Sequence, residues 1–412
     1  MRALVLGYGR SGKAAEALLR AQGVETVVLA DDERDRIEGE GFDFAVVSPG
    51  IALTHKWIVE AKRRGIPLKS ELQLGCEELW RQGWKLLAVT GSKGKSSVVK
   101  VVADAINLEG MKAVACGNYG VPVCEVALSG VASDSRSSGD ARWAVVEVSS
   151  FMMETTELPS DTFEAAAILN LQEDHLDRHG SVEVYHGLKR KLLSFAALNF
   201  VNEGLSSDQR TNGPSDHLWT GSYFDNEILA GNAASAVELM RVAGLDEVVI
   251  GRAFREFAPL PHRMNLVAEI DGVRYIDDSK ATSLAALVAG VKMASSGIRT
   301  FEHSNIRTIL LIAGGLPKGD DPKTALATLT ERVKKVYLIG QSAEAFFAAW
   351  KGAVDCEICG TMERAVEKAK REAEKGETVL LSPGTASFDQ FKSYGERGEV
   401  FARLVKEKGQ PK

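Results

Sequence analysis

The segment T-G-S-K-G-K-S-S at residues 90–97 constrains this chain more than any other. It follows an apolar run at residues 86–89 and precedes a helical pattern at residues 98–106, so the sequence predicts a strand, a glycine loop and a helix. In such a loop the backbone amides cradle phosphates, Lys95 neutralises phosphate charge and the Ser96 hydroxyl can bind Mg²⁺. The loop departs from the G-x-x-x-x-G-K-[S/T] pattern, because a valine stands where that pattern has its first glycine. A surface turn without a ligand is the alternative interpretation.

A second glycine loop, G-Y-G-R-S-G, lies at residues 7–12 between a predicted strand at 3–6 and a helical pattern. Its glycines allow a tight turn and let a diphosphate approach the helix N-terminus. Asp31 follows about 20 residues later at the end of the next strand, where a ribose-binding carboxylate would stand. Alone, this loop fits NAD, another nucleoside diphosphate or a ligand-free turn. Together, the two loops favour a kinase or ligase that acts on a nucleotide-bearing substrate.

Candidate metal ligands follow two apolar strands of the middle block. Glu147 lies at the end of the run 144–148, where a carboxylate can meet Mg²⁺ and phosphates. His175 and His179 follow the run 166–169 and could share a helical face, but zinc would need a third ligand, and none is evident. His175 is therefore either a ligand of a second Mg²⁺ or a hydrogen-bonded histidine at the rim. The other polar residues that follow this strand are Asn170, Glu173 and Asp174.

Three further strand-to-helix junctions occur near the C-terminus. They are Asp277–Thr282, the Gly314-Gly315 turn with Lys318, and Ser382–Ser387. Hydroxyl groups, lysines and helix N-terminal amides suit an anionic group such as a carboxylate or phosphate. Because the carboxyl ends of parallel strands share one edge of a sheet, the sequence predicts that these junctions lie at one edge, where ligands gather.

The predicted fold class is α/β with parallel sheets, because strands and helical patterns alternate along the chain. At roughly 150 residues per domain, 412 residues suggest two or three domains. We predict three, at residues 1–84, 85–260 and 261–412. The predicted strands are 3–6, 27–30, 44–47, 86–89, 144–148, 166–169, 266–270, 273–276, 308–312, 335–339 and 378–381.

Composition excludes several classes of protein. The 50 basic and 56 acidic residues give a net charge of −6, which argues against a dedicated nucleic-acid binder. No apolar run approaches the roughly 18 residues of a membrane span, and five sparse cysteines favour reduced thiols in a cytoplasm. Cys356 and Cys359 form a single C-x-x-C, which we interpret as packing residues rather than zinc ligands.

Seven segments of the chain, in order, resemble the motifs of the Mur ligases. They are VTGSKGKSS at 89–97, EVSSF at 147–151, ILNLQEDHLDRHGS at 168–181, PHRMNLV at 261–267, IDDSKATS at 276–283, IAGGLPKG at 312–319 and LSPGTASFDQFKSYGERG at 381–398. The resemblance runs from about residue 1 to 408. Within the family, the DSKAT and SPxxASxDQF patterns are most similar to those of the member that adds D-glutamate.

The resemblance implies a fold and an activity. The fold would comprise an N-terminal Rossmann-like domain, a central P-loop ATPase-type domain and a C-terminal Rossmann-like domain. The activity would be ATP-dependent ligation of D-glutamate to UDP-N-acetylmuramoyl-L-alanine through an acyl phosphate, in cytoplasmic peptidoglycan precursor synthesis. ATP and two Mg²⁺ ions would be required. The protein would be a monomer with no nucleic-acid or membrane partner.

The resemblance also implies roles for individual residues. The catalytic residues would be Lys95, Glu147, His175 and Lys189. The metal ligands would be Ser96, Glu147, His175 and Lys189, the last as a carbamate. ATP would contact Gly91, Ser92, Lys93, Gly94, Lys95, Ser96, Ser97, Asn232, Arg263 and Asp277. The UDP substrate would contact Gly9, Arg10, Ser11, Gly12, Asp31, Ser48, Pro49, Gly50 and Asn118. D-Glutamate would contact Lys280, Thr282, Lys318, Ser387, Phe388 and Tyr394.

Some points remain open at this level. Composition predicts a solvated basic helix face for Lys189 and Lys191, and only the resemblance selects Lys189. The chain departs from the usual family residues at Lys93, Met152, Gln172, Gly384-Thr385 and Tyr394. The alternatives are a ligase for another amino acid, a folylpolyglutamate-type synthetase, a nucleotide-sensing protein without catalysis and an NAD dehydrogenase.

Overall fold

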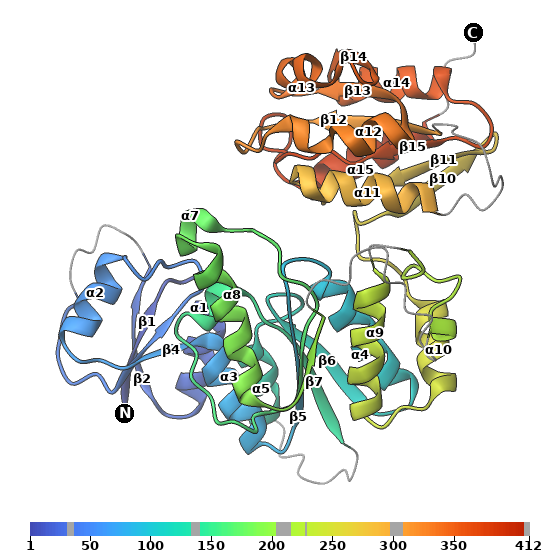
Figure 1. Cartoon of the computed structure of the whole chain (residues 1–412). Coiled ribbons are helices and arrows are strands. Elements are labelled where there is room, and N and C mark those ends of the chain that lie inside the picture. Colours follow the sequence, from blue (N-terminus) through green and yellow to red (C-terminus); the bar gives the residue numbers. More distant parts are fainter. Residues whose placement is uncertain (31–36, 133–140, 203–215, 227–228, 297–307, 408–412) are drawn as a thin grey trace. The chain divides into compact units, whose positions relative to one another are not determined.

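The computed structural model describes residues 1–30, 37–132, 141–202, 216–226, 229–296 and 308–407. The chain forms two compact units (Figure 1). The first unit comprises Met1–Asp225 and Leu229–Phe257, and the second comprises Asn226–Ile228 and Ala258–Lys412. The first unit holds two sheets and the second holds one.

The first sheet has four parallel strands in the order β2-β1-β3-β4. Side chains alternate along β1, so that Leu4 and Leu6 pack toward α2 while Ala3 and Val5 pack toward α1 and α3. The helices therefore cover both faces, as a parallel sheet requires. The elements are β1 (Arg2–Leu6), α1 (Arg10–Ala21), β2 (Glu25–Leu29), β3 (Phe44–Val47), α2 (Lys56–Arg63), β4 (Leu68–Ser70) and α3 (Glu71–Arg81).

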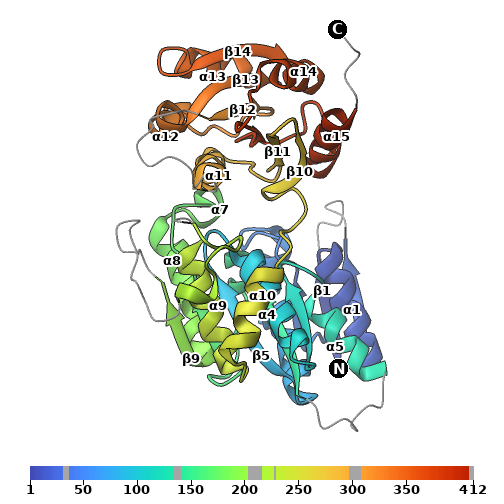
Figure 2. The same cartoon turned by 90° about the vertical axis from the view of Figure 1, so that its right-hand side faces the viewer.

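The second sheet has five parallel strands in the order β6-β7-β5-β8-β9. Its elements are β5 (Lys85–Thr90), α4 (Lys95–Leu108), β6 (Lys112–Gly117), α5 (Val123–Ala132), β7 (Arg142–Glu147), α6 (Ser150–Met153), β8 (Phe163–Ile168), α7 (Leu176–His179), α8 (Val182–Lys191), η1 (Leu192–Phe195), β9 (Ala196–Val201), η2 (Asp216–Leu218), α9 (Ala230–Val242) and α10 (Glu247–Glu256). Helices α4, α9 and α10 pack side by side (Figure 2). Helices α1 and α3 pack against α5, so the first two sheets share one hydrophobic core.

The third sheet forms the second unit, with the order β10-β11-β15-β12-β13-β14 and only β10 antiparallel to its neighbour among the described strands. Cys356 packs into the core on one face of this sheet and Cys359 into the core on the other, which agrees with packing residues. The elements are β10 (Asn265–Ile270), β11 (Val273–Asp277), α11 (Leu284–Ser296), β12 (Ile309–Gly314), η3 (Pro322–Ala325), α12 (Leu326–Arg332), β13 (Val333–Ile339), α13 (Ala343–Trp350), β14 (Asp355–Gly360), α14 (Met362–Glu372), β15 (Thr378–Leu381) and α15 (Tyr394–Lys406).

The predicted α/β class and parallel sheets are confirmed, and all eleven predicted strands are present within a few residues. Four strands were not predicted: β4, β6, β9 and β14. All four lie at sheet edges. Strand β4 is only three residues long, and Asn199 in β9 and Asp355 and Glu357 in β14 interrupt the apolar pattern. The three sheets fall within the three predicted blocks, whose boundaries stay a prediction. Among the described residues, none of the helices is both long and apolar enough to span a membrane.

The first glycine loop generates a test of the packing. An added Cβ at Gly12 would lie 2.0 Å from the Gly7 carbonyl oxygen, whereas one at Gly9 would meet no atom within 4 Å. We expect Gly12→Ala to lower the urea midpoint of the first unit, at a cost of about 1–3 kcal/mol from overpacking. Gly9→Ala is the matched control and should cost less than about 1 kcal/mol. Equal midpoints for the two variants would contradict this reading of the loop.

Candidate functional site

The loop between β5 and α4 has the backbone of a phosphate cradle. Gly91 has φ of +150° and Gly94 has φ of +84°, conformations that side chains disfavour. An added Cβ at Gly94 would lie 2.0 Å from the Asn232 amide nitrogen, so this buried side chain of α9 packs directly against the loop. The predicted strand, loop and helix are therefore confirmed, and Asn232 packs against the loop; its contact with the nucleotide stays a prediction.

Side chains that follow β8 and lie on α8 hold this loop in place. The Asn170 amide accepts a hydrogen bond from the Lys93 backbone nitrogen and donates one to the Lys93 carbonyl, both at 2.9 Å. The Ser92 hydroxyl donates to the Gln172 carbonyl at 2.9 Å and accepts from its backbone nitrogen at 3.0 Å. The Tyr185 hydroxyl donates to Ser92 Oγ at 3.2 Å. The sequence indicated that Asn170 follows a strand, but it did not reveal that this side chain forms two hydrogen bonds with the backbone of the loop.

Two lysines converge on a single carbonyl oxygen of the loop. Lys95 Nζ and Lys189 Nζ each lie 2.8 Å from the Gly91 carbonyl oxygen. Lys189 is 1% exposed, and burial, followed by the nearby Lys95 charge, lowers its pKa to about 7. Lys191 instead lies at the surface, 2.6 Å from Glu157. Composition alone would place Lys189 on a solvated face, but the residue is buried because it lies one turn after Tyr185 on the side of α8 that is directed toward the loop.

Glu147 ends β7 with one carboxylate oxygen unpaired. The side chain is 2% exposed, and the Asn118 amide donates to Oε1 at 2.7 Å. Within the part of the chain that the structure describes, the buried Oε2 atom accepts no hydrogen bond. A buried carboxylate oxygen without a donor is costly unless a cation approaches it. This residue therefore fits a ligand of a hard divalent cation.

The His175 and His179 rings both contact Phe151 and Tyr185, as side chains on one side of this segment would, but the two histidines differ in exposure. His175 precedes α7 in a left-handed conformation with φ of +52°, and its side chain is 48% exposed. Its ring lies 4.8 Å from the Phe151 ring and 6.2 Å from the Tyr185 ring. His179 is buried, with Nε2 3.0 Å from Ser150 Oγ. Among the described residues, no three His, Cys, Asp or Glu side chains form a metal-binding group.

The loops of the first sheet meet the second sheet through the other glycine loop. Ser48 is buried and donates to the Gly7 carbonyl at 2.8 Å, which ties the segment after β3 to the loop after β1. Arg10 donates to the Gly120 carbonyl at 3.0 Å, close to Asn118. The predicted UDP-substrate residues Gly9–Gly12, Ser48 and Asn118 are thus brought together in one unit. Asp31 lies outside the described residues.

Arg178 joins three structural elements of this unit. Its guanidinium donates to the Glu154 carboxylate at 2.6 and 3.0 Å and to the Ile51 carbonyl at 2.8 Å. A longer contact of 3.3 Å reaches the Pro49 carbonyl. The guanidinium also lies over the Phe151 ring at 5.0 Å. Arg178 therefore connects the predicted UDP-substrate loop to the short helix that His175 precedes, a role that the sequence did not reveal although the residue lies within a quoted motif.

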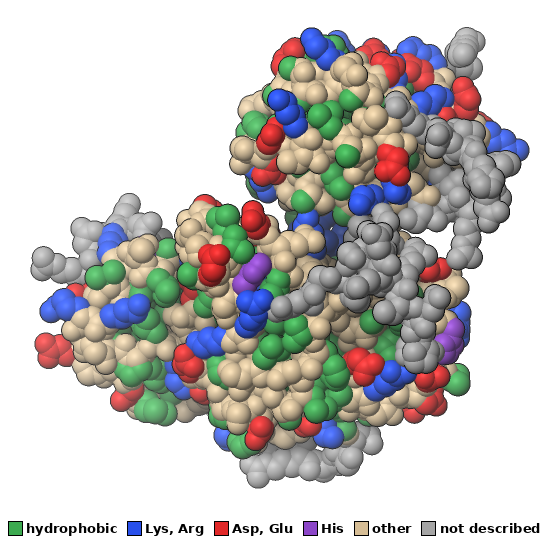
Figure 3. Space-filling view, viewed as in Figure 1, with side chains coloured by type: hydrophobic (Ala, Val, Ile, Leu, Met, Phe, Trp, Pro, Cys, Tyr) green, Lys and Arg blue, Asp and Glu red, His purple; other side chains and the backbone are tan. Residues whose placement is uncertain are grey.

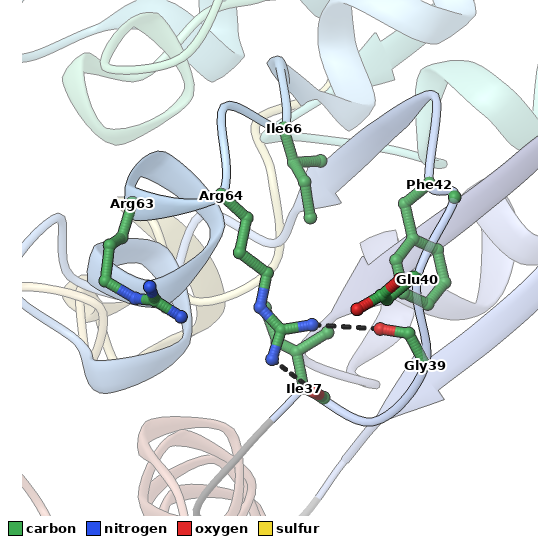
Figure 4. A pocket seen from close by; sticks show the side chains of 8 residues that line it. Ile37, Gly39, Glu40, Phe42, Arg63, Arg64 and Ile66 are labelled. Carbon is green, nitrogen blue, oxygen red and sulfur yellow. Dashed lines mark hydrogen bonds between the residues drawn. The ribbon is translucent and has the colours of Figure 1, made fainter.

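The first sheet also has a hollow at its opposite edge, lined by residues that precede β3 and β4 (Figure 4). Its volume is about 710 Å³. The Arg64 guanidinium donates to the Ile37 and Gly39 carbonyls, and both Arg63 and Arg64 pair with Glu60. These cations already have partners in the fold, and the hollow lies at the amino ends of the strands rather than at the glycine loop.

In the second unit, the three predicted junctions follow neighbouring parallel strands, β11, β15 and β12, so they lie at one sheet edge as expected. Asp277 Oδ2 lies 2.7 Å from His262 Nδ1, and Oδ1 accepts from the Ser279 backbone nitrogen at 2.8 Å. Lys280 Nζ lies 3.7 Å from the centre of the Tyr394 ring. Among the other predicted residues, Ser387 is buried, Arg263 and Thr282 are partly buried, and Lys318 and Phe388 are exposed.

Comparisons with known proteins agree on one family. The family described as "Mur ligase middle domain" matches residues 89–204, and "Mur ligase, glutamate ligase domain" matches residues 262–384. The chain is 34% identical to the UDP-N-acetylmuramoylalanine–D-glutamate ligase of Nitratidesulfovibrio vulgaris, over 98% of this chain and 95% of that protein. It is 32% identical to the ligase of the same name from Chlamydia caviae, over 98% and 97%. Its fold is similar to that of a MurF ligase from Thermotoga maritima solved with ADP, with a TM-score of 0.55 and 16% identity over 88% and 94% of the two chains.

The Arg178 contacts generate a prediction about stability and local motion. Arg178→Gln would leave the Glu154 side chain, which is 7% exposed, without its paired guanidinium. We expect the free energy of unfolding of the first unit to fall by about 2–4 kcal/mol, because breaking a buried pair leaves an uncompensated charge. Hydrogen exchange should also accelerate at residues 49–52 and 175–179.

Arg252→Gln is the control, because Arg252 forms a surface pair with Glu256 on α10. It should change stability by less than about 1 kcal/mol. The double variant R178Q/E154Q should recover part of the loss. Unchanged exchange at residues 49–52 in Arg178→Gln would show that the guanidinium does not hold that loop.

Proposed function

The chain belongs to the Mur ligase family, and we propose that it joins D-glutamate to UDP-N-acetylmuramoyl-L-alanine using ATP. One observation carries this conclusion: a phosphate loop, a buried carboxylate with an unpaired oxygen and a buried lysine of lowered pKa meet at one sheet edge. This arrangement suits a triphosphate and divalent cations. The curated relatives that match over nearly the whole chain carry the name of this ligase.

The reaction proceeds in two steps. The carboxylate of the UDP substrate attacks the γ-phosphorus of ATP, so that an acyl phosphate forms and ADP leaves. The amine of D-glutamate, once deprotonated, attacks the acyl carbon, and the tetrahedral intermediate collapses to an amide and inorganic phosphate. Phosphoryl transfer depends mainly on positioning and charge neutralisation. Lys95 and the backbone amides of the loop supply both at the γ-phosphate.

We assign the nucleotide and metal ligands to the first unit and to the start of the second. Residues 91–97 and Asn232 would bind the triphosphate, with Arg263 and Asp277 at the nucleoside. Ser96, Glu147, His175 and carbamylated Lys189 would hold two Mg²⁺ ions, and the free Oε2 atom of Glu147 supports this assignment. Bound Mg²⁺ supplies a Lewis acid that offsets phosphate charge.

Lys189 is suited to carry the carbamate. Burial favours its neutral amine, which can attack CO₂ so that an N–C bond forms and a proton is released. The product is a carboxylate-like oxygen donor, which hard cations prefer. The adjacent Lys95 charge would stabilise this anion.

The remaining assignments concern the two other substrates. Gly9–Gly12, Asp31, Ser48–Gly50 and Asn118 would bind the UDP substrate, and the Arg178 contacts with the 49–51 carbonyls support a fixed loop there. The D-glutamate site would comprise Lys280, Thr282, Lys318, Ser387, Phe388 and Tyr394.

We further propose that the enzyme acts as a cytoplasmic monomer without nucleic-acid or membrane partners. Its substrates are soluble nucleotides and an amino acid. On the face drawn in Figure 3, acidic and basic side chains of the described residues are interspersed rather than gathered in a basic stripe. The net charge of −6 points the same way.

ATP-dependent phosphate release is the direct test of the activity. We expect turnover with UDP-N-acetylmuramoyl-L-alanine and D-glutamate, and little with L-glutamate or other amino acids. Lys95→Ala should lower kcat at least about 10³-fold, because it removes charge neutralisation at the γ-phosphate. Lys85→Ala is the control and should retain activity, because Lys85 lies at the exposed amino end of β5, away from the loop that follows that strand. Preference for another amino acid would point instead to a different Mur ligase or a folylpolyglutamate-type enzyme.

The carbamate has its own test. With ¹³C-bicarbonate, the wild-type protein should show a carbamate signal in ¹³C NMR that Lys189→Ala loses and Lys191→Ala retains. Lys189→Ala should also lose activity and regain part of it with added short carboxylic acids, which can replace the missing oxygen donor. A signal that persists in Lys189→Ala would refute the assignment.

A further inference from the structure

Arg397 is a fully buried arginine in the first turn of α15 with no acidic hydrogen-bond partner. It is 0% exposed, and Nε donates to Ser279 Oγ at 3.0 Å. The Nη2 atom donates to the carbonyls of Ser279 at 2.9 Å and Thr385 at 3.1 Å, and Nη1 donates to that of Ala386 at 3.2 Å. All four acceptors are neutral oxygens. Within the described ranges, no carboxylate forms an ion pair with this guanidinium.

A buried cation without a counter-ion is costly, so its presence calls for a reason. Burial lowers the pKa of Arg397 to about 10, while Asp389 and Asp277 act in the opposite direction. The group is therefore still protonated at neutral pH. All four of its hydrogen bonds go to neutral oxygens, and Asp389 and Asp277 offset its positive charge through space rather than through an ion pair. The remaining field acts on an anionic ligand nearby.

The four hydrogen bonds hold together the junctions that follow β11 and β15. Ser279 also donates from Oγ to the Tyr394 carbonyl at 2.8 Å, which closes the connection to α15. The junction after β12 joins them, because the backbones of Leu316 and Ala386 exchange hydrogen bonds of 2.9 and 3.2 Å. The Arg397 guanidinium thus bonds two neighbouring loops directly, and the third loop is hydrogen-bonded to one of these two.

The residues assigned above to D-glutamate adjoin the atoms that Arg397 holds. Lys280 follows Ser279, Ser387 follows Ala386, and Tyr394 lies one helical turn before Arg397 itself. A displacement of the Ser279 or Ala386 backbone would therefore move Lys280 or Ser387. The charge of Arg397 adds to that of Lys280 in the same region, which favours a ligand with two negative groups over a ligand with one.

We propose that Arg397 is a positioning and specificity residue for the amino-acid substrate: it fixes the loops at Ser279–Lys280 and Thr385–Ser387, and its unpaired charge selects a dicarboxylic amino acid over its neutral amide. This inference rests on the proposed function for the identity of the substrate. It differs from that function in assigning specificity to a group that the ligand does not touch.

Arg397→Lys, Arg397→Met and Ser279→Ala separate the charge of Arg397 from its hydrogen bonds. Arg397→Lys keeps the charge and loses the planar fork, whereas Arg397→Met removes the charge and keeps much of the volume. Arg403→Met is the matched control, because Arg403 lies on the same helix, is exposed and pairs with Glu407. The measurements are KM and kcat for each substrate, with D-glutamine as the neutral competitor, and calorimetric binding of D-glutamate in the presence of ADP and the UDP substrate.

We expect Arg397→Lys to raise KM for D-glutamate at least 10-fold while KM for ATP and for the UDP substrate changes less than 2-fold. Arg397→Met should raise KM for D-glutamate further and lower the preference for D-glutamate over D-glutamine at least 10-fold. Ser279→Ala, which removes one acceptor but keeps the charge, should raise KM for D-glutamate and retain the preference. Arg403→Met should behave as wild type.

The proposal is overturned if Arg397→Met keeps the wild-type KM for D-glutamate and the wild-type preference. It is also overturned if KM rises equally for all three substrates, since that would indicate a general structural role. If Arg397→Met does not fold, Arg397→Gln, which also removes the charge, decides through the same ratios. If the wild type binds D-glutamate without turning it over, the proposed activity is wrong, and calorimetry on the variants still tests the role of Arg397. If the wild type neither binds nor uses D-glutamate, the proposed activity and the proposed role of Arg397 are both wrong.

Discussion

The carbonyl oxygen of Gly91 accepts hydrogen bonds from two lysines, Lys95 and Lys189, and the rest of the site depends on this convergence. Burial, and then the repulsion between the two ammonium groups, lowers the pKa of Lys189, the more buried of the two lysines. Nearby, the Glu147 carboxylate has an oxygen that accepts no hydrogen bond from the described residues. These features are unfavourable in the isolated protein, and each would become favourable in the proposed complex, in which a polyphosphate and divalent cations supply the missing charges. The fold therefore holds charged groups in place that only a bound ligand of opposite charge can neutralise.

The same structural device recurs at the carboxyl edge of all three sheets. In each case a polar side chain from another part of the chain forms hydrogen bonds with the backbone of a loop that follows a strand. Ser48 holds the loop after β1, Asn170 clamps the loop after β5, and Arg397 fixes the loops after β11 and β15. Because each side chain bonds backbone groups, the loop keeps its shape whatever side chains it carries, and its free amides and lysines remain directed toward a ligand.

This device explains why several departures from the usual family residues leave the site intact. Lys93 contacts Asn170 through its backbone, and Gln172 contacts Ser92 through its backbone as well, so the side chain at either position can change. The Thr385 carbonyl accepts a hydrogen bond from Arg397, and the Tyr394 carbonyl accepts one from Ser279 Oγ, so neither contact depends on the side chain at that position. The Tyr394 ring still accepts Lys280 over its face, as a phenylalanine ring could. For the buried Met152, nothing in the structure explains the replacement of the usual glutamine.

Local sequence determined the parallel α/β class, the two glycine loops and the polar residues that follow each strand, because strand periodicity, glycine conformation and position at a strand end are local properties. The order of the motifs also determined the family. Tertiary structure alone decided that Lys189 is buried while Lys191 is exposed, that His179 packs in the interior while His175 remains at the rim, and that Asn170, Arg178 and Arg397 hold backbone carbonyls. Strands β6, β9 and β14 likewise lie at sheet edges, where each is hydrogen-bonded to one neighbouring strand that is distant or separate in the sequence. Burial, pKa and hydrogen-bond partner all depend on residues distant in the chain, and no local pattern encodes them.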